Sequence, residues 1–458
     1  MKFKIIEPRN QIAEDEKRFS NKALFALILP IVIEQALALL VGIADTFMGS
    51  YAGEAVISGI SLVTQIDNVF IVIFSAMAAG GSVVISQYIG AGERSKGIRA
   101  ASQLLMIVSI VGLAVAALIL VFADGIFSLL FGSVEAGVHN AGVLYMRISA
   151  CSFIFLGIYN AGAGVQRSMG DTRTVMYVAM VMNGMNIAGN AVGIFALHAG
   201  VAGIAVPSLI SRAAAAVIML VLVLKPEKYI YVRLREVLSW DGQMIKRIFS
   251  IALPNSVENG LFMLAKLFIS TVVATFGTVQ IAAYGTAQSF WSMSAVFCLA
   301  MNSAFITVVG QYMGRNDTKG ADYYLMKLLR IDMVGAVLWN VALFGIALLV
   351  INFYSLSPEA ASLAIILVLI HNVFNGFLYS VSSGLSSGLR AAGDARYSMV
   401  STIISSVVVR VVMSVLLGYV CGLGVIGVAF GMVAEWICKG ILIWTRYRSG
   451  RWKNFKVI

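Results

Sequence analysis

The sequence predicts an all-α membrane protein with twelve transmembrane helices, arranged as two parallel six-helix repeats, an N-lobe and a C-lobe, around a central cleft. Three observations predict this class: the composition, the apolar segments of membrane-spanning length, and an internal repeat. Of the 458 residues, 60% are hydrophobic and 12% are charged, whereas soluble domains contain about 45–50% apolar and about 25% charged residues. This composition excludes a soluble globular, disordered, collagenous or coiled-coil protein, because so few polar residues cannot cover a water-exposed surface.

Twelve apolar segments are long enough to cross a bilayer, whose core of about 30 Å requires about 20 helical residues. They are 23–48, 55–85, 100–123, 137–160, 173–197, 201–224, 248–276, 280–309, 324–351, 359–385, 396–419 and 424–445. The segments 55–85 and 280–309 are longer than a crossing requires, so we expect these helices to tilt or to extend past the bilayer.

A polar stretch separates two sets of six segments. We therefore expect an N-terminal tail at 1–22, the N-lobe at 23–224, a linker at 225–247, the C-lobe at 248–445 and a C-terminal tail at 446–458.

The basic residues follow the expected topology. Of the 33 Lys and Arg residues, 28 lie in the two tails or beside the even-numbered loops, and none lies in the odd-numbered loops. Cytoplasmic loops carry an excess of Lys and Arg, so both termini and the linker are expected in the cytoplasm. The net charge of +11 therefore reflects topology, and it requires no nucleic-acid partner.

The two halves of the sequence resemble each other. The matching pairs are Leu29-Pro30-x-x-x-Glu34 with Leu253-Pro254-x-x-x-Glu258, Gln87–Gly90 with Gln311–Gly314, Arg167–Arg173 with Arg390–Arg396, and Gly200–Gly203 with Gly424–Gly427, at offsets of 223 or 224. Each repeat has an even number of spans, so both copies insert the same way up and are related by an axis along the membrane normal. Two such lobes leave a cleft between them, and rocking them gives alternating access.

These motifs resemble the multidrug and toxic compound extrusion (MATE) family over nearly the whole chain. The marks are Pro30 in a first helix that ends in Ala44-Asp45-Thr46-Phe47-Met48-Gly49, the loop Gln87-Tyr88-Ile89-Gly90-Ala91-Gly92, and the two Gly-Asp-x-Arg loops. The resemblance implies two six-helix bundles and an antiporter in the cytoplasmic (inner) membrane of a prokaryote. Such an antiporter exports organic cations and drugs in exchange for H⁺ or Na⁺.

The resemblance also implies a coupling site in the N-lobe. Asp45 matches the first-helix carboxylate used in cation coupling, and Pro30 matches the proline at which that helix bends. Asn186 matches an asparagine of the same site. Asn190 stands where DinF-type members have a second aspartate, and Ser208 stands where they have a threonine.

The resemblance leaves the coupling ion open. Glu258 resembles the seventh-helix glutamate of the sodium-linked NorM-type branch, but Tyr379 stands where that branch has a tenth-helix aspartate. Neither branch's full set of residues is present, so both H⁺ and Na⁺ remain candidates.

Helical geometry places Glu34 and Asp45 on one face of the first helix. They are eleven residues apart, so they project within about 20° of each other and lie about 16 Å apart along the axis. If that face lines the cleft, the two carboxylates form steps of a cation path. Alternatively, Asp45 is an interfacial aspartate in water, and Glu34 pairs with a buried base such as Arg147 or Arg212.

Other polar residues within the spans are also candidates, because charged groups at membrane depth usually face a cavity or a partner. Glu258 is either a cation site or part of a structural network with Lys266, which lies about 80° round the helix and is a poor direct partner. Asp67 lines the cavity or caps a local break. Arg410 lines the cavity or neutralises a C-lobe carboxylate.

Two further motifs allow more than one interpretation. Asn186 and Asn190, four residues apart on one helix face, either take part in the site or hold helices together. In the Gly-Asp-x-Arg loops, we expect the aspartate to cap the following helix and the arginine to act as a topology charge; the alternative is a direct role in transport.

Other function classes fit less well. The chain has three His residues, no HExxH or paired-His spacing and no Walker A sequence, so we expect neither an enzyme nor a metal site. We expect no cofactor, no nucleotide and no nucleic acid. The expected partners of a monomeric transporter are the lipid bilayer and amphipathic cationic small molecules. The alternatives are a flippase of lipid-linked precursors from the same superfamily and a scaffold or receptor.

Overall fold

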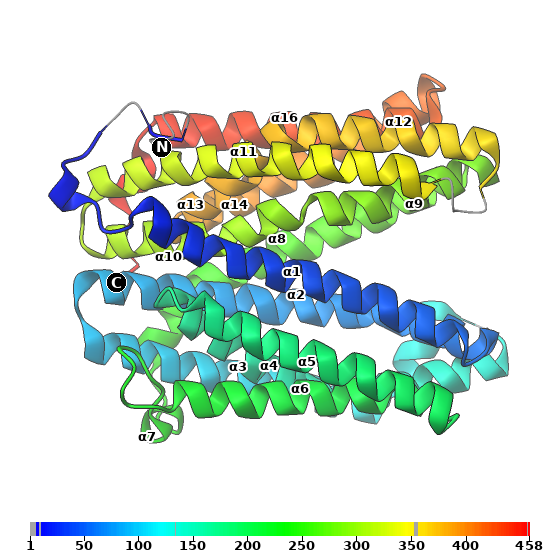
Figure 1. Cartoon of the computed structure of the whole chain (residues 1–458), viewed down its shortest axis with the longest axis horizontal. Coiled ribbons are helices and arrows are strands. Elements are labelled where there is room, and N and C mark those ends of the chain that lie inside the picture. Colours follow the sequence, from blue (N-terminus) through cyan, green and yellow to red (C-terminus); the bar gives the residue numbers. More distant parts are fainter. Residues whose placement is uncertain (1–5, 9–10, 133, 352–355, 456) are drawn as a thin grey trace. The chain divides into compact units, whose positions relative to one another are not determined.

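The computed structural model describes residues 6–8, 11–132, 134–351, 356–455 and 457–458, and these residues form helices and no strand (Figure 1). Twelve helices among them are long and apolar enough to cross a membrane. This count confirms the twelve-span, all-α prediction.

In the first half of the chain, the first four helices are longer than the predicted spans, whereas the fifth and sixth spans match the prediction to within one residue at each end. Their bounds are α1 Asn21–Ser50, α2 Glu54–Ala91, α3 Arg94–Phe131, α4 Ala136–Ser168, α5 Thr172–Ala191 continued by η2 Val192–Ala196, α6 Ala202–Val223 and the short α7 Leu234–Val237.

In the second half, several spans are built from more than one helical segment. Their bounds are α8 Gly242–Ala274, α9 Thr278–Ser294, α10 Val296–Gly314, α11 Thr318–Val350, α12 Pro358–Phe374, η4 Asn375–Gly384, α13 Leu385–Ala392, α14 Ala395–Thr402, η5 Ile403–Val409, α15 Arg410–Met413, η6 Ser414–Val420 and α16 Gly424–Arg448. The segments η2, η4, η5 and η6 are π-helical. Such turns break the regular α-helical hydrogen bonding and are frequent at functional sites.

The chain folds as two compact units. The N-terminal unit is residues 29–253, and the C-terminal unit is residues 254–458 together with the segment that ends at Ile28. The chain therefore passes from one unit to the other within α1 and within α8, next to Pro30 and Pro254.

Small residues allow the helices of the N-terminal unit to pack closely. A Cβ atom added at Gly59 on α2 would lie 2.7 Å from the backbone nitrogen of Gly142 on α4. Contacts of this kind replace the hydrophobic effect, which does not drive helices together in lipid. The apolar core of this unit includes Val63, Phe74 and Phe153.

The C-terminal unit has a core of its own and repeats a turn of the N-terminal unit. This core includes Ile269, Phe290 and Leu367. Gly53 and Gly277, which are equivalent in the repeat, have φ angles of 108° and 93°, a region that favours glycine. Each precedes the second helix of its repeat.

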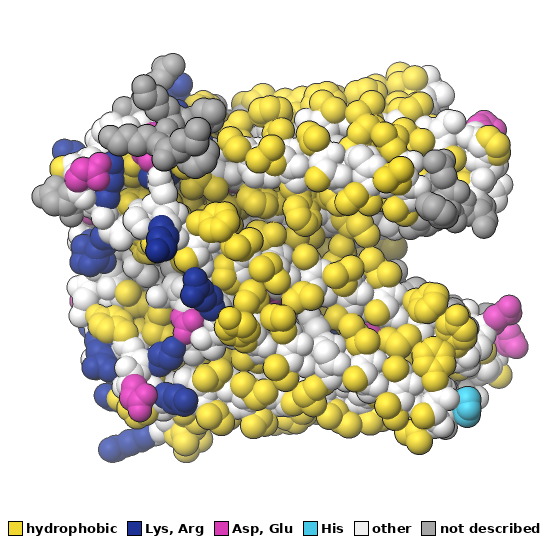
Figure 2. All heavy atoms as spheres, viewed as in Figure 1, with side chains coloured by type: hydrophobic (Ala, Val, Ile, Leu, Met, Phe, Trp, Pro, Cys, Tyr) yellow, Lys and Arg dark blue, Asp and Glu magenta, His cyan; other side chains and the backbone are white. Residues whose placement is uncertain are grey.

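The surface of each unit fits a bilayer. Large apolar side chains are exposed along the helices, among them Val121, Leu338 and Val341. In each unit, Lys and Arg side chains gather at one end of the helices (Figure 2). Lipid tails can cover the apolar sides, and the basic ends suit the interface.

The two Gly-Asp-x-Arg loops use their aspartates differently. Asp171 caps α5 by accepting a hydrogen bond from the Thr174 backbone nitrogen (3.3 Å), as predicted, and it also pairs with Lys228 (2.7 Å). Burial raises the pKa of the Asp171 carboxyl, but the hydrogen bonds from Lys228 and Thr174 outweigh burial and hold the pKa below its usual range. Asp394 accepts no capping hydrogen bond and pairs with Arg446 instead (2.6 Å), so the prediction of a cap is wrong at the second loop.

Candidate functional site

A chain of polar side chains crosses the inside of the N-terminal unit, from α1 to α5 and on to α6. The Asn190 amide donates a hydrogen bond to the Asp45 carboxylate (2.6 Å) and another to the Asn186 oxygen (3.2 Å). The Asn186 amide donates to the Ser208 hydroxyl (2.9 Å). The structure therefore brings together four candidates that lie up to 163 residues apart in the chain.

Local sequence features place these side chains. Asn186 and Asn190 share one face of α5 because they are four residues apart. Gly189 lies between them, and a Cβ atom there would approach the Pro207 ring to 2.6 Å. The glycine thus lets α6 come close enough for Ser208, the next residue after Pro207, to contact Asn186.

This site can bind a small positive species. It presents a carboxylate and several neutral oxygens, and it is closed from solvent at Asn190, which is fully buried. The Asn190 side-chain oxygen is buried without a hydrogen-bond partner, so it has a free lone pair. Carboxylate and carbonyl-type oxygens are suitable ligands for a hard cation, and a carboxylate also accepts a proton.

Arg212 and Asp67 lie beside this polar chain. Ser149 donates a hydrogen bond to the buried Asp67 carboxylate. Arg212 donates to the Ser152 hydroxyl (2.7 Å), which in turn donates to the Ser149 carbonyl (2.6 Å). The charge of Arg212 acts on both Asp45 and Asp67. The Arg212 guanidinium therefore offsets part of the negative charge of these two carboxylates without forming a direct ion pair with either.

Glu34 is paired, but not with the bases named from the sequence. Its carboxylate forms an ion pair with Arg167. Arg147 pairs with Asp124 at the surface (2.6 Å), and Arg212 bonds Ser152. Glu34 therefore pairs with a base, as one alternative predicted, but that base is Arg167 and neither Arg147 nor Arg212. Arg167 was missed because it was counted as a loop charge, whereas α4 continues through it to Ser168.

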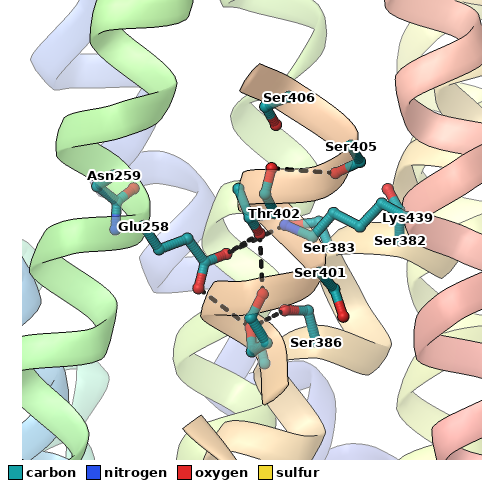
Figure 3. A network of polar contacts seen from close by, with 12 residues as sticks. Glu258, Asn259, Ser382, Ser383, Ser386, Ser401, Thr402, Ser405, Ser406 and Lys439 are labelled. Atoms are coloured by element: carbon teal, nitrogen blue, oxygen red, sulfur yellow. Dashed lines mark hydrogen bonds and ion pairs between the residues drawn. The ribbon is translucent and has the colours of Figure 1, made fainter. Parts of the chain in front are cut away.

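Glu258 holds the equivalent position in the C-terminal unit and lies in a denser network (Figure 3). Its carboxylate pairs with Arg390 and Lys439, each at 3.1 Å, and accepts hydrogen bonds from Thr402 (2.8 Å) and Ser398 (3.1 Å). Lys266 is not a partner.

Lys266 lies instead over an aromatic ring. Its ammonium is 5.7 Å from the centre of the Trp291 ring. The ring of Tyr379 lies between two tryptophans, with centroids 6.2 Å from Trp291 and 5.5 Å from Trp436. Tyr379 is thus part of an aromatic group in the C-terminal unit. It occupies the position where the NorM-type branch has an aspartate.

Arg410 neutralises a carboxylate of the C-terminal unit, as one alternative predicted. The partner is Glu435 on α16 (3.1 Å), which also accepts a hydrogen bond from Ser406 (2.5 Å). Glu435 and the buried Asp332 on α11 were not among the residues predicted from the sequence. Each is an acid within an apolar span, a signal that the sequence contained.

The described part of the chain contains no group of three or more His, Cys, Asp or Glu residues placed to hold a metal ion.

Comparisons with known proteins match both repeats. The MatE family model matches residues 30–192 and again residues 254–416. The two matches are offset by 224 residues, which confirms the internal repeat. Together they cover more than half of the chain.

Curated relatives cover the chain almost end to end. The chain is 28% identical to the uncharacterized transporter YisQ of Bacillus subtilis, over 95% of each chain. It is 26% identical to the probable multidrug resistance protein NorM of Thermotoga maritima, over 98% of this chain and 97% of that protein. It is 25% identical to the multidrug export protein MepA of Staphylococcus haemolyticus, over 75% of each chain.

Solved structures share the fold. An outward-facing multidrug resistance MATE family transporter of the MOP superfamily aligns with a TM-score of 0.87 at 21% identity, over 96% of this chain and 100% of that chain. A MATE crystal structure in the straight conformation aligns with a TM-score of 0.87 at 22% identity, over 95% of this chain and 97% of that chain.

Proposed function

The chain belongs to the MatE family of multi-pass membrane transporters, and from this premise we propose that it is a secondary antiporter. In this proposal it exports amphipathic organic cations across the cytoplasmic membrane of a prokaryote in exchange for H⁺ or Na⁺. Relatives named as multidrug export or resistance proteins support drug export.

One observation carries the proposal: the Asp45 carboxylate is held by Asn190 inside the N-terminal unit. A carboxylate inside the unit binds one positive species at a time, because the first one bound neutralises its charge and the carboxylate then no longer attracts a second. Uptake of H⁺ or Na⁺ therefore weakens its attraction for a cationic drug. Exchange of one cation for another follows from that competition.

The proposed cycle uses alternating access. The outward-facing protein takes up the coupling ion at Asp45, Asn186 and Asn190, and the drug leaves. The first helix then bends near Pro30, whose nitrogen cannot donate a helical hydrogen bond. The two repeats rock to give alternating access, and the ion is released inside. Glu34 and Glu258, with their basic partners, hold the helices of each unit in register.

The remaining features of the proposal come from charge and composition. The distribution of Lys and Arg supports cytoplasmic termini. We propose that the protein acts as a monomer in the bilayer, without nucleotide or other cofactor, so that an ion gradient supplies the energy.

Proteoliposome transport tests the proposal. Ethidium efflux is measured under an imposed pH gradient and, separately, under a Na⁺ gradient. We expect one gradient to drive efflux by the wild type and Asp45→Asn to lose most of it. Asp124→Asn is the matched control, because Asp124 is a half-exposed partner of Arg147 and should leave efflux unchanged.

Two results would contradict the proposal. Equal gradient-driven efflux by Asp45→Asn and the wild type would remove Asp45 from the mechanism. Movement of a fluorescent lipid-linked precursor between leaflets, without ethidium efflux, would favour the alternative, a flippase of the same superfamily.

A further inference from the structure

Asp332 is a buried acid with no ionic partner in the C-terminal unit. It lies near the middle of α11 and is fully buried. Neither of its carboxylate oxygens has a hydrogen bond of ordinary length and angle. The polar groups that interact with it are the Cys298 thiol on α10 and the Ser380 hydroxyl on η4.

The polar side chains around Asp332 form a small cluster against the π-helical segment η4. The Cys298 sulfur lies 3.4 Å from the Ser380 oxygen and 3.7 Å from the Asn375 side-chain oxygen. Asn375 is fully buried, and its amide nitrogen has no hydrogen-bond partner. Gly384 leaves room for the carboxylate, since a Cβ atom there would lie 3.0 Å from Asp332 Oδ2.

No described basic side chain forms an ion pair with Asp332. The other titratable groups that act on it are the Cys298 thiol and the Tyr379 phenol, from α10 and η4. By contrast, the buried carboxylates Glu34, Glu258 and Glu435 each pair with an arginine.

An ionised carboxylate in such a place is strongly disfavoured, because burial removes its hydration and nothing replaces it. The group must therefore hold a proton or a cation. The neighbours favour a proton. A hard cation such as Na⁺ needs several oxygen ligands, whereas a thiol, a soft group, stands next to Asp332.

We propose that Asp332 is a proton-binding site of the C-terminal unit that is loaded and emptied during transport. The proton forms an O–H bond with one carboxylate oxygen and leaves to water when water reaches this polar cluster, so the step needs no other reactant. This inference rests on the proposed transport function, and it adds a proton-binding site in the repeat that lacks Asp45.

Infrared spectroscopy tests protonation without measuring transport. The purified protein is titrated, and the carboxylic-acid C=O band of the wild type is compared with that of Asp332→Asn. Asp322→Asn is the control on the same helix, because Asp322 is paired with Tyr447 (2.6 Å). We expect a band that Asp332→Asn lacks and Asp322→Asn keeps. Above its midpoint the acid form should fall about tenfold per pH unit.

A second variant guards against a folding failure of Asp332→Asn. Cys298→Ser places a stronger hydrogen-bond donor beside the carboxylate and so stabilises its charged form. The acid band should persist in this variant but disappear at lower pH than in the wild type.

The outcomes separate this inference from the proposed function. A wild type that shows no acid band assignable to Asp332, or that loses the band when Na⁺ is added at fixed pH, would overturn proton binding. A band at every pH, with unchanged ethidium efflux by Asp332→Asn, would make Asp332 a structural acid and overturn its part in transport. A titrating band in a protein that exports no ethidium would refute the proposed cargo and leave the protonation site standing.

Discussion

Arg167 forms an ion pair with Glu34, a residue 133 positions earlier in the chain. The second repeat has the same pair between Arg390 and Glu258, 132 positions apart. In each unit, the proline-containing helix is thus tied to the end of the helix that precedes the Gly-Asp-x-Arg loop. The duplication has kept an interaction as well as a sequence motif.

Removal of one partner of the first pair should destabilise the protein. Arg167→Leu leaves the Glu34 carboxylate buried without its cation, which is expected to cost about 3–5 kcal/mol. The check is the apparent Tm of the detergent-solubilised protein. Arg147→Leu is the control, because its pair with Asp124 is half-exposed and is worth at most about 1 kcal/mol. Equal losses of Tm in the two variants would refute the role of the Glu34 pair.

Loss of the Asn190 amide should impair transport. Asn190→Ala removes a hydrogen bond to Asp45, which is worth about 1.5–3 kcal/mol for a charged acceptor. We therefore expect ethidium efflux to fall by about tenfold or more. Asn160→Ala is the control, since Asn160 donates to the Leu156 carbonyl one turn away (2.9 Å). Unchanged efflux in Asn190→Ala would show that Asp45 works without this amide.

Acid should weaken the loop that precedes α5. Because the folded protein lowers the pKa of Asp171, its stabilising effect is complete above the ordinary pKa of 3.8 and is lost as the pH falls below that value. Asp171→Asn keeps an oxygen that can cap α5 but loses the ion pair with Lys228, so the stability at pH 7 should fall by at most about 1 kcal/mol. The Tm should therefore be lower than that of the wild type at pH 7, and the further loss on acidification should be smaller. A Tm profile parallel to that of the wild type between neutral and acidic pH would contradict this prediction.

The N-terminal segment should detach when Glu7 is neutralised. Glu7 pairs with the buried ammonium of Lys327 (2.8 Å), and the Tyr312 hydroxyl accepts a hydrogen bond from the Arg18 backbone (3.0 Å). Burial raises the pKa of Glu7, but the hydrogen bonds from Lys327 and Tyr323 outweigh burial and lower the pKa.

Limited trypsin digestion measures this attachment. Glu7→Gln should increase the rate of cleavage after Lys17 and Arg18, because Lys327 loses its counter-charge. Glu14→Gln is the control, since Glu14 is exposed and pairs with Lys17 only three residues away. Cleavage as slow as in the wild type would show that the tail is held without the Glu7 pair.

The class of protein and its twelve spans could be predicted from the sequence. A helix must supply about 20 apolar residues to cross a bilayer, and this is a local property of each segment. The repeat could also be predicted from the sequence, because a duplicated stretch carries its motifs at a constant offset. The polar set of Asp45, Asn186, Asn190 and Ser208 followed from the family resemblance, and the structure joins these residues by hydrogen bonds.

Ionic partners were decided only by tertiary packing. Glu34 meets Arg167 and not Arg212, and Arg410 meets Glu435, because these contacts depend on how helices far apart in the chain are rotated and packed. The same packing buries Asp332 where no base among the described residues pairs with it. Helical periodicity places a side chain on one face of its own helix, but only the assembled bundle determines what faces it.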